Sequence, residues 1–141
     1  MKIAVVALGK IGLPLAVQFA KKGHQVIGCD VNPKTVELVN AGTEPFPGEA
    51  HLDAYMKEVV SSGLLTATTD TTSAVSQSEA VVIVVPLFVD NDGVPDFGWM
   101  DEATEKIAAG LKPDTLVSYE TTLPVGTTRN RFAKALEKGS G

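Results

Sequence analysis

The N-terminal part of the chain, up to Asp30, constrains the fold more than any other segment. Residues 2–7 form an apolar run that predicts a short strand almost at the N-terminus. A glycine-containing turn follows at residues 8–12, and residues 11–22 have the apolar pattern of a helix. A second apolar strand, Gln25–Cys29, then ends at Asp30. Strand, glycine turn, helix, strand and acid, in this order, are the layout of a dinucleotide-binding site.

This layout has a specific chemistry. Backbone N–H groups at the helix N-terminus can hold a pyrophosphate anion. The carboxylate of Asp30 can accept hydrogen bonds from the adenosine ribose, and it would repel a phosphate at the 2′ position. The sequence therefore predicts NAD, rather than NADP, as the cofactor.

The glycine motif departs from the usual G-x-G-x-x-G pattern at its first position, which is Ala7. Alanine fits there if its φ stays negative. Gly9 lets the backbone approach the pyrophosphate, and Gly12 lets the helix pack closely on the sheet. The alternative is a glycine-rich turn in a doubly wound protein that binds no nucleotide. The flanking strands and Asp30 favour the nucleotide site.

Composition narrows the class of protein. With 141 residues, 44% of them hydrophobic, the chain suits one domain with a sizeable core. A net charge of −5 argues against nucleic acid as the main partner. No segment suits a membrane span or a signal peptide, and the single cysteine fits a reducing cytoplasm. His24 and His51 lie far apart, and no metal-ligand cluster is expected.

Strand and helix patterns alternate along the chain and predict an α/β fold. The expected strands are residues 2–7, 25–29, 65–69, 80–85 and 116–119, and the expected helices are 11–22, 33–40, 52–61, 71–78, 100–111 and 127–138, with a polar loop at 90–98. These elements predict a doubly wound, Rossmann-like sheet of five parallel strands in the order 3-2-1-4-5, with helices on both faces.

Ligands of such sheets bind at the carboxyl ends of the strands, where the strand order reverses. The reversal here lies between the first and fourth strands. Gly9, Val85–Pro86 and Thr121–Thr122 should therefore converge on one crevice, with Asp30 at its adenosine end.

Longer motifs carry a specific family resemblance. They are G-K-I-G-L-P-L-A at 9–16, G-H-Q-V-I-G-C-D at 23–30, V-V-P at 84–86, P-D at 95–96, K-P-D-T-L-V at 112–117 and E-T-T-L-P-V-G-T at 120–127. From end to end the chain resembles the NAD-binding domain of the nucleotide-sugar dehydrogenases, the UDP-glucose/GDP-mannose dehydrogenase family. It looks most like the branch that acts on UDP-N-acetylhexosamines, such as UDP-N-acetylmannosamine dehydrogenase.

The resemblance implies an oxidoreductase that converts the C6 alcohol of a UDP-sugar to a carboxylate in two NAD-dependent steps, through a cysteine thiohemiacetal and a thioester. The family takes its catalytic cysteine, lysine and asparagine from segments beyond this domain. We therefore expect residues 1–141 to be an NAD-binding fragment without the linking helix and the sugar-nucleotide domain. Such a fragment would bind NAD without turnover, and the intact enzyme would be a cytoplasmic homo-oligomer.

The resemblance also implies roles for single residues. Asp30 would hold the adenosine ribose, with Lys34 beside it. Backbone contacts to the pyrophosphate fall to the turn residues Gly9, Lys10, Ile11 and Gly12.

The remaining implied contacts follow the fourth and fifth strands. Val85 and Pro86 would line the cofactor, and Thr121 and Thr122 would face its nicotinamide end. Thr122 matches the family threonine whose hydroxyl positions the catalytic water. The family often has threonine on either side of Pro86, where this chain has Val85 and Leu87, so two hydroxyl contacts are missing.

Simpler roles compete with some of these. Thr121 and Thr122 could be β-favouring residues at a strand end, and Glu120 is equally a cofactor contact or a solvated charge. Cys29 is expected to pack in the core rather than act as a nucleophile. Trp99 is expected to cover the sheet edge rather than stack on a base.

Two other functions remain open from the sequence. One is a stand-alone NAD-sensing or regulatory module without catalytic groups. The other is the coenzyme domain of a β-hydroxy-acid dehydrogenase, a related class with the same layout.

Overall fold

A five-stranded parallel sheet forms the centre of the computed structural model, which describes residues 1–141. The strand order is β3-β2-β1-β4-β7. The strands are β1 (Lys2–Val6), β2 (Gln25–Cys29), β3 (Leu65–Thr68), β4 (Ala80–Ile83) and β7 (Leu116–Tyr119). This confirms the predicted order, in which β7 takes the fifth place.

The sheet is covered on both faces because its central strands are apolar throughout. Every residue of β4 is buried, as are all residues of β1 after Lys2. Strand β1 pairs with β2 from Lys2–Gln25 to Val6–Cys29 and with β4 from Ile3–Ala80 to Val6–Ile83. The two strands therefore end side by side at the carboxyl edge, where the order reverses.

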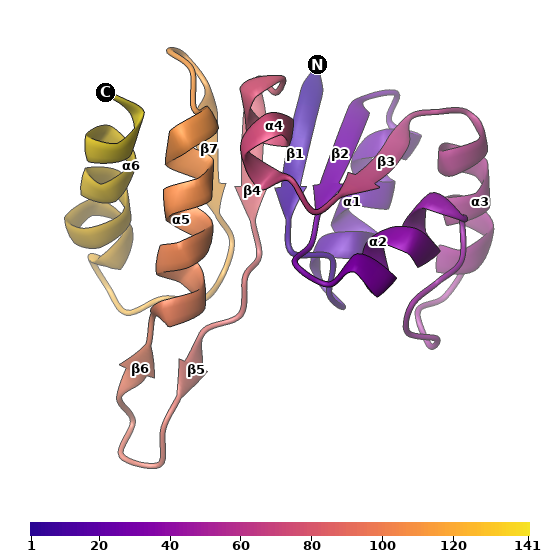
Figure 1. Cartoon of the computed structure of the whole chain (residues 1–141). Helices are drawn as coiled ribbons and strands as arrows, with labels where there is room; N and C mark the ends of the chain where they lie inside the picture. The colour runs from indigo at the N-terminus through magenta and orange to yellow at the C-terminus, as the bar shows by residue number, and fades with distance from the viewer.

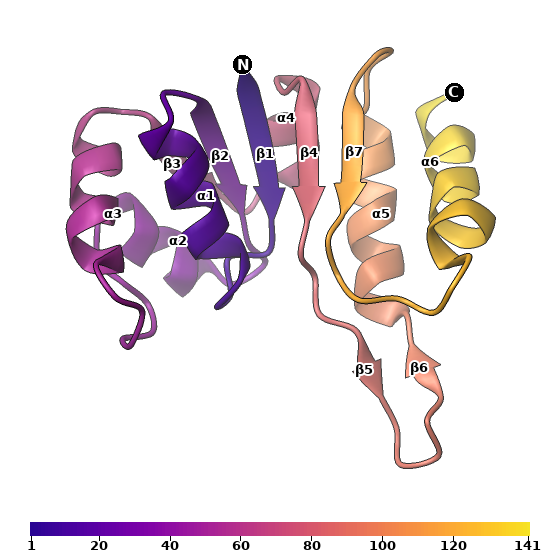
Figure 2. The same ribbon diagram turned by 180° about the vertical axis from the view of Figure 1, so that it is seen from behind.

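Helices divide between the two faces, as Figures 1 and 2 show. One face carries α1 (Gly12–Lys21) and α3 (Leu52–Ser61), and the short helix α2 (Pro33–Asn40) packs against β3 at that end of the sheet. The opposite face carries α4 (Thr71–Ser76), α5 (Gly98–Gly110) and α6 (Ala133–Ser140). Two separate apolar clusters result, one on each side of the sheet. The doubly wound prediction is confirmed.

The segment 90–98 differs from its prediction as a polar loop. It belongs to a hairpin of β5 (Phe88–Val89) and β6 (Pro95–Asp96), which projects beyond the carboxyl edge of the sheet in Figure 1. The carboxylate of Asp90 closes its turn by accepting hydrogen bonds from the N–H groups of Asp92 and Val94, at 3.0 and 2.8 Å. Two-residue strands are too short for a period-two pattern, which is why the sequence did not reveal them.

The last helix also begins differently from its prediction. A π-helical segment, η1 (Thr128–Phe132), precedes α6. Arg131 in this segment donates from Nε to the Asp101 carboxylate of α5 at 2.8 Å and lies 4.6 Å from the Phe97 ring centroid. The basic side chain thus ties η1 to α5. No helix in the structure has the length and apolar character needed to cross a membrane.

Candidate functional site

The first backbone N–H groups of helix α1 have no hydrogen-bond acceptor within the protein. No side chain caps it, and no acidic residue lies in its first turn. The backbone N–H groups of Gly9, Lys10, Ile11 and Gly12 donate to no acceptor in the protein, whereas that of Leu13 donates to the Gly9 carbonyl at 3.1 Å. Unpaired N–H groups and the helix dipole make this end of α1 suited to an anion.

The two glycines of the turn have different surroundings. A Cβ at Gly12 would overlap the carbonyl oxygen of Ala7 and lie 2.6 Å from Cγ2 of Val84. A Cβ at Gly9 would meet nothing within 4 Å. Gly12 is therefore required by packing between α1 and the sheet, and Gly9 leaves open space above the helix N-terminus for a ligand.

Ala7 overturns the expectation of a negative φ at the first motif position. Its φ is +78°, in the left-handed region that favours glycine. The conformation is held from both sides, since the N–H of Ala7 donates to the Cys29 carbonyl at 2.8 Å and the next N–H, of Leu8, donates to Asp30. The turn takes the shape that a glycine would give it, at the cost of backbone strain.

Asp30 joins the end of β2 to this turn. Its Oδ2 accepts a hydrogen bond from the N–H of Leu8 at 2.9 Å, and its Oδ1 accepts one from the N–H of Asn32 at 2.9 Å. A carboxylate has about four lone-pair sites, so each oxygen of Asp30 keeps capacity for a further donor. The Asp30 carboxylate is thus held against the turn and oriented to accept hydrogen bonds from hydroxyl groups.

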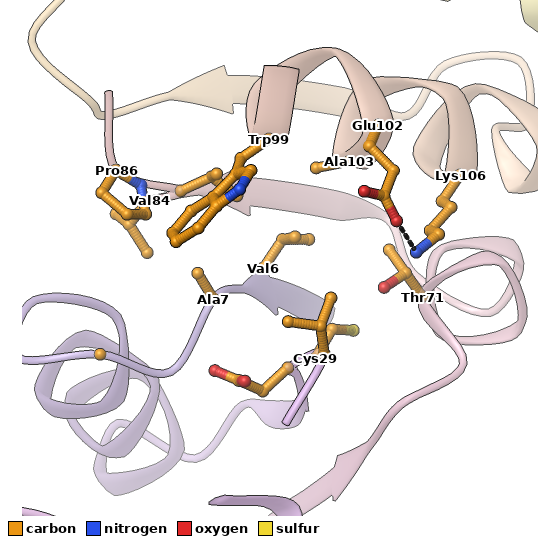
Figure 3. A pocket seen from close by; sticks show the side chains of 14 residues that line it. Val6, Ala7, Cys29, Thr71, Val84, Pro86, Trp99, Glu102, Ala103 and Lys106 are labelled. Carbon is orange, nitrogen blue, oxygen red and sulfur yellow. Dashed lines mark hydrogen bonds and ion pairs between the residues drawn. The ribbon is translucent and has the colours of Figure 1, made fainter. Parts of the chain in front are cut away.

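A pocket of about 390 Å³ opens beside Asp30 at the carboxyl edge of the sheet (Figure 3). The ends of β1 and β4 form its floor, and α5 forms one wall. Its lining residues are Val6, Ala7, Gly9, Cys29, Asp30, Val31, Thr71, Val84, Val85, Pro86, Trp99, Glu102, Ala103 and Lys106. The size and the mostly apolar walls suit a small ligand held by a few polar groups.

The structure brings four of the predicted site residues together in this pocket: Gly9, Asp30, Val85 and Pro86. Lys10, Ile11 and Gly12 follow directly at the unpaired helix N-terminus described above. Their predicted contacts with a cofactor stay predictions.

The other predicted residues lie outside the pocket. Lys34 forms an exposed ion pair with Glu37 at 3.0 Å. The hydroxyl of Thr121 donates to the carbonyl of Val85 at 2.6 Å, which joins the ends of β7 and β4. Thr122 is exposed in the loop after β7 and forms no hydrogen bond through its side chain. A separate open hollow of about 680 Å³ involves Thr121 and the loop 123–130.

Cys29 is part of the core, as expected. The residue is fully buried, and burial raises the pKa of its thiol to about 12. A thiol that stays protonated at neutral pH is not a nucleophile. No group of three or more His, Cys, Asp or Glu side chains is arranged to hold a metal ion.

Trp99 lies at the pocket and not where the sequence predicted it. Instead of covering the sheet edge, its indole extends from the first turn of α5 toward Ala7 in Figure 3 and lines the pocket. The hairpin before α5 sets this position, and because that hairpin was not predicted, the sequence contained no usable signal for it.

Comparisons with known proteins also indicate an NAD-binding domain. The model of the UDP-glucose/GDP-mannose dehydrogenase family, NAD-binding domain, matches residues 1–141. The UDP-N-acetyl-D-mannosamine dehydrogenase of Pyrococcus horikoshii is 35% identical over 141 residues, which is 100% of this chain and 33% of that protein. Its namesake from Salmonella typhimurium is 40% identical over 126 residues, 89% of this chain and 29% of that protein.

Solved structures agree with these sequence matches. A ternary complex of GDP-mannose dehydrogenase from Pseudomonas aeruginosa superimposes with a TM-score of 0.93 at 29% identity, covering 100% of this chain and 33% of the other. The chain spans about a third of the length of the curated relatives it matches.

Proposed function

Because this chain belongs to the UDP-glucose/GDP-mannose dehydrogenase family and matches its NAD-binding domain throughout, we propose that it is the cofactor-binding part of a nucleotide-sugar 6-dehydrogenase. Such an enzyme oxidises the C6 primary alcohol of a UDP-sugar to a carboxylate in two steps. NAD supplies the hydride acceptor for each step. The match of the family model to residues 1–141 favours this family over the β-hydroxy-acid dehydrogenases.

The observation that carries the proposal is the contact between Asp30 and the glycine turn. The N–H groups at residues 9–12 lie unpaired at the start of α1, and Asp30 is fixed beside them by Leu8. In the proposal, these N–H groups hold the pyrophosphate and Asp30 accepts hydrogen bonds from the ribose hydroxyls. A 2′-phosphate would meet the negative charge of Asp30, so NAD is preferred over NADP.

The nicotinamide end of the cofactor is assigned to the carboxyl end of β7, which lies next to that of β4. Val85 and Pro86 would contact the cofactor, and Thr121 would hold the two strand ends together through its bond to Val85. Thr122 has a free hydroxyl in the adjoining loop, and we assign to it the positioning of the catalytic water. Lys34 would reach the ribose only if its side chain left Glu37.

The groups that react with the sugar are assigned to sequence outside these 141 residues. Cys29, the one cysteine of the chain, is buried and protonated. Relatives three times as long have room for a separate nucleophile and a sugar-nucleotide domain. We propose that residues 1–141 bind NAD but do not oxidise a UDP-sugar.

The proposed substrate is a UDP-N-acetylhexosamine. Two curated relatives named UDP-N-acetyl-D-mannosamine dehydrogenase, at 35% and 40% identity, support this choice. We further propose that the intact enzyme is a cytoplasmic homo-oligomer.

Isothermal titration calorimetry of the 141-residue chain with NAD, NADP and UDP-N-acetylmannosamine tests the proposal. We expect binding of NAD, at least tenfold weaker binding of NADP and no heat with the UDP-sugar. Tighter binding of NADP than of NAD would contradict the role of Asp30, and no binding of either dinucleotide would contradict the proposed function.

A further inference from the structure

Trp99 exposes an unusually large apolar surface beside the pocket. It is the only tryptophan of the chain, and 61% of its surface is accessible. Tryptophan is highly buried on average, so an exposed indole at a pocket marks a binding surface. Figure 3 shows the indole between Pro86 and Ala7, with the pocket extending beyond it to Thr71 and Lys106.

The indole is held in place before any ligand arrives. Its ring meets that of Phe88 edge to face, with 4.9 Å between the centroids and an interplanar angle of 86°. The first turn of α5 is fixed by the Asp96 carboxylate, which accepts from the N–H of Gly98 at 2.9 Å. Hairpin β5–β6 therefore sets the orientation of Trp99, and binding would cost little side-chain entropy.

The position of Asp30 decides which part of a dinucleotide would meet this indole. Asp30 lines the same pocket as Trp99, with Val31 and Thr71 on the β2 side. The ribose next to Asp30 carries a base that must enter the space between these residues and α5. Thr121 and the carboxyl end of β7 are not part of the pocket lining, which leaves the nicotinamide outside it.

We propose that Trp99 is a cofactor-binding residue whose indole stacks on the adenine ring of NAD, an inference that rests on the function proposed above. A flat aromatic side chain is the natural partner of a purine face, and base–aromatic stacking makes a measurable contribution to affinity. Trp99 takes no part in hydride transfer under this assignment. It increases affinity for any ligand with an adenosine 5′-diphosphate group.

Tryptophan fluorescence tests the assignment directly, since the emission of the chain comes from one indole. Excitation at the red edge of the indole band avoids absorption by adenine. We expect NAD, ADP-ribose and ADP to quench the emission to a similar extent, and nicotinamide mononucleotide to leave it unchanged. Quenching by nicotinamide mononucleotide but not by ADP would overturn the assignment to adenine.

Calorimetry on variants gives the second readout. Trp99→Ala should weaken NAD and ADP-ribose binding about tenfold, while Trp99→Phe, which keeps an aromatic face, should stay within about threefold of the parent chain. Val89→Ala is the matched control, because Val89 is an exposed apolar residue of the same hairpin that does not line the pocket. This variant should bind like the parent.

The outcomes separate this inference from the proposed function. If the parent and Trp99→Ala bind NAD equally well, the proposal that Trp99 stacks on adenine is wrong, and the proposed NAD-binding function stands. If the parent binds no dinucleotide, both are wrong. Circular dichroism of Trp99→Ala shows that any loss of affinity occurs in a folded chain.

Discussion

The backbone N–H of Leu8 donates a 2.9 Å hydrogen bond to Oδ2 of Asp30, which joins the glycine turn after β1 to the acid that ends β2. Twenty-two residues separate the two in sequence. One bond thus fixes the shape of the turn and the direction of the carboxylate together. Each of the two parts of the proposed cofactor site therefore depends on the other.

Replacement of Asp30 tests this double role. Asp30→Ala should weaken NAD binding by about 10- to 100-fold, because hydrogen bonds from the ribose to a charged group are lost. NADP affinity should change far less, so that the preference for NAD narrows. The variant should also lose about 1–3 kcal/mol of unfolding free energy, since the N–H of Leu8 is left without a partner.

Asp30→Asn separates the two roles, because an amide oxygen can replace one acceptor but carries no charge. It should recover part of the lost stability and little of the discrimination against NADP. Calorimetry and urea unfolding measure the two quantities. Unchanged affinities for both dinucleotides in Asp30→Ala would show that this carboxylate does not contact the cofactor.

The two glycines of the turn form a matched pair. Gly9→Ala places a methyl group in open space, so unfolding free energy should change by less than about 1 kcal/mol. NAD affinity should nevertheless fall at least tenfold, because the methyl group occupies the space needed by the pyrophosphate. Gly12→Ala should instead destabilise the chain by about 3 kcal/mol through overlap with Ala7. Equal effects of the two variants on stability would argue against this division of roles.

Ala7→Gly should stabilise the chain. Relief of a φ of +78° offsets the greater flexibility of glycine in the unfolded state, and the expected gain is about 1 kcal/mol. NAD binding should be as tight as in the parent or tighter. Ala16→Gly, a buried change within α1, is the control and should cost about 1 kcal/mol. A loss of stability in Ala7→Gly would show that the turn is not strained.

Cys29 makes stability depend on alkaline pH. Its pKa of about 12 in the folded chain exceeds the ordinary value of 9.0, so between these values the unfolded chain loses a proton that the folded chain retains. The unfolded state then binds fewer protons, and unfolding free energy falls as pH rises, by about 1.4 kcal/mol per pH unit. Below about pH 9 the thiol is protonated in both states and contributes no slope.

Urea unfolding of the parent and of Cys29→Ala across this range measures the effect. The parent should lose stability more steeply with pH than the variant. Burial also raises the pKa of Tyr119, but that side chain is present in both proteins and its contribution cancels. Parallel pH profiles would contradict a buried, protonated Cys29.

The sheet and much of the site follow from strong local patterns. Runs such as Ala80–Ile83 are apolar throughout, which identifies buried parallel strands, and right-handed crossovers leave few strand orders. Asp30 could be predicted as the ribose-binding acid because it directly follows β2, the first strand after the glycine turn and α1. Its proximity to Leu8 required only the sheet order.

The remaining features depend on contacts that no local pattern encodes. The positive φ of Ala7 is imposed by hydrogen bonds to Cys29 and Asp30, not by alanine itself. Trp99 reaches the pocket because the hairpin β5–β6 and α5 are placed together by tertiary packing. The family resemblance implied a place for Lys34 beside the ribose, which stays a prediction, and no local pattern indicated the exposed ion pair of its side chain with Glu37.

NMR titration of the isotope-labelled chain with NAD, followed through backbone amide signals, tests most directly whether the glycine turn after β1 holds the cofactor. If NAD binds at this turn, the largest shifts should occur at residues 9–12, whose N–H groups have no partner in the protein, with further shifts at Asp30 and Trp99. Shifts confined to the loop 121–130, with the amides of the turn unchanged, would contradict binding of NAD at the glycine turn.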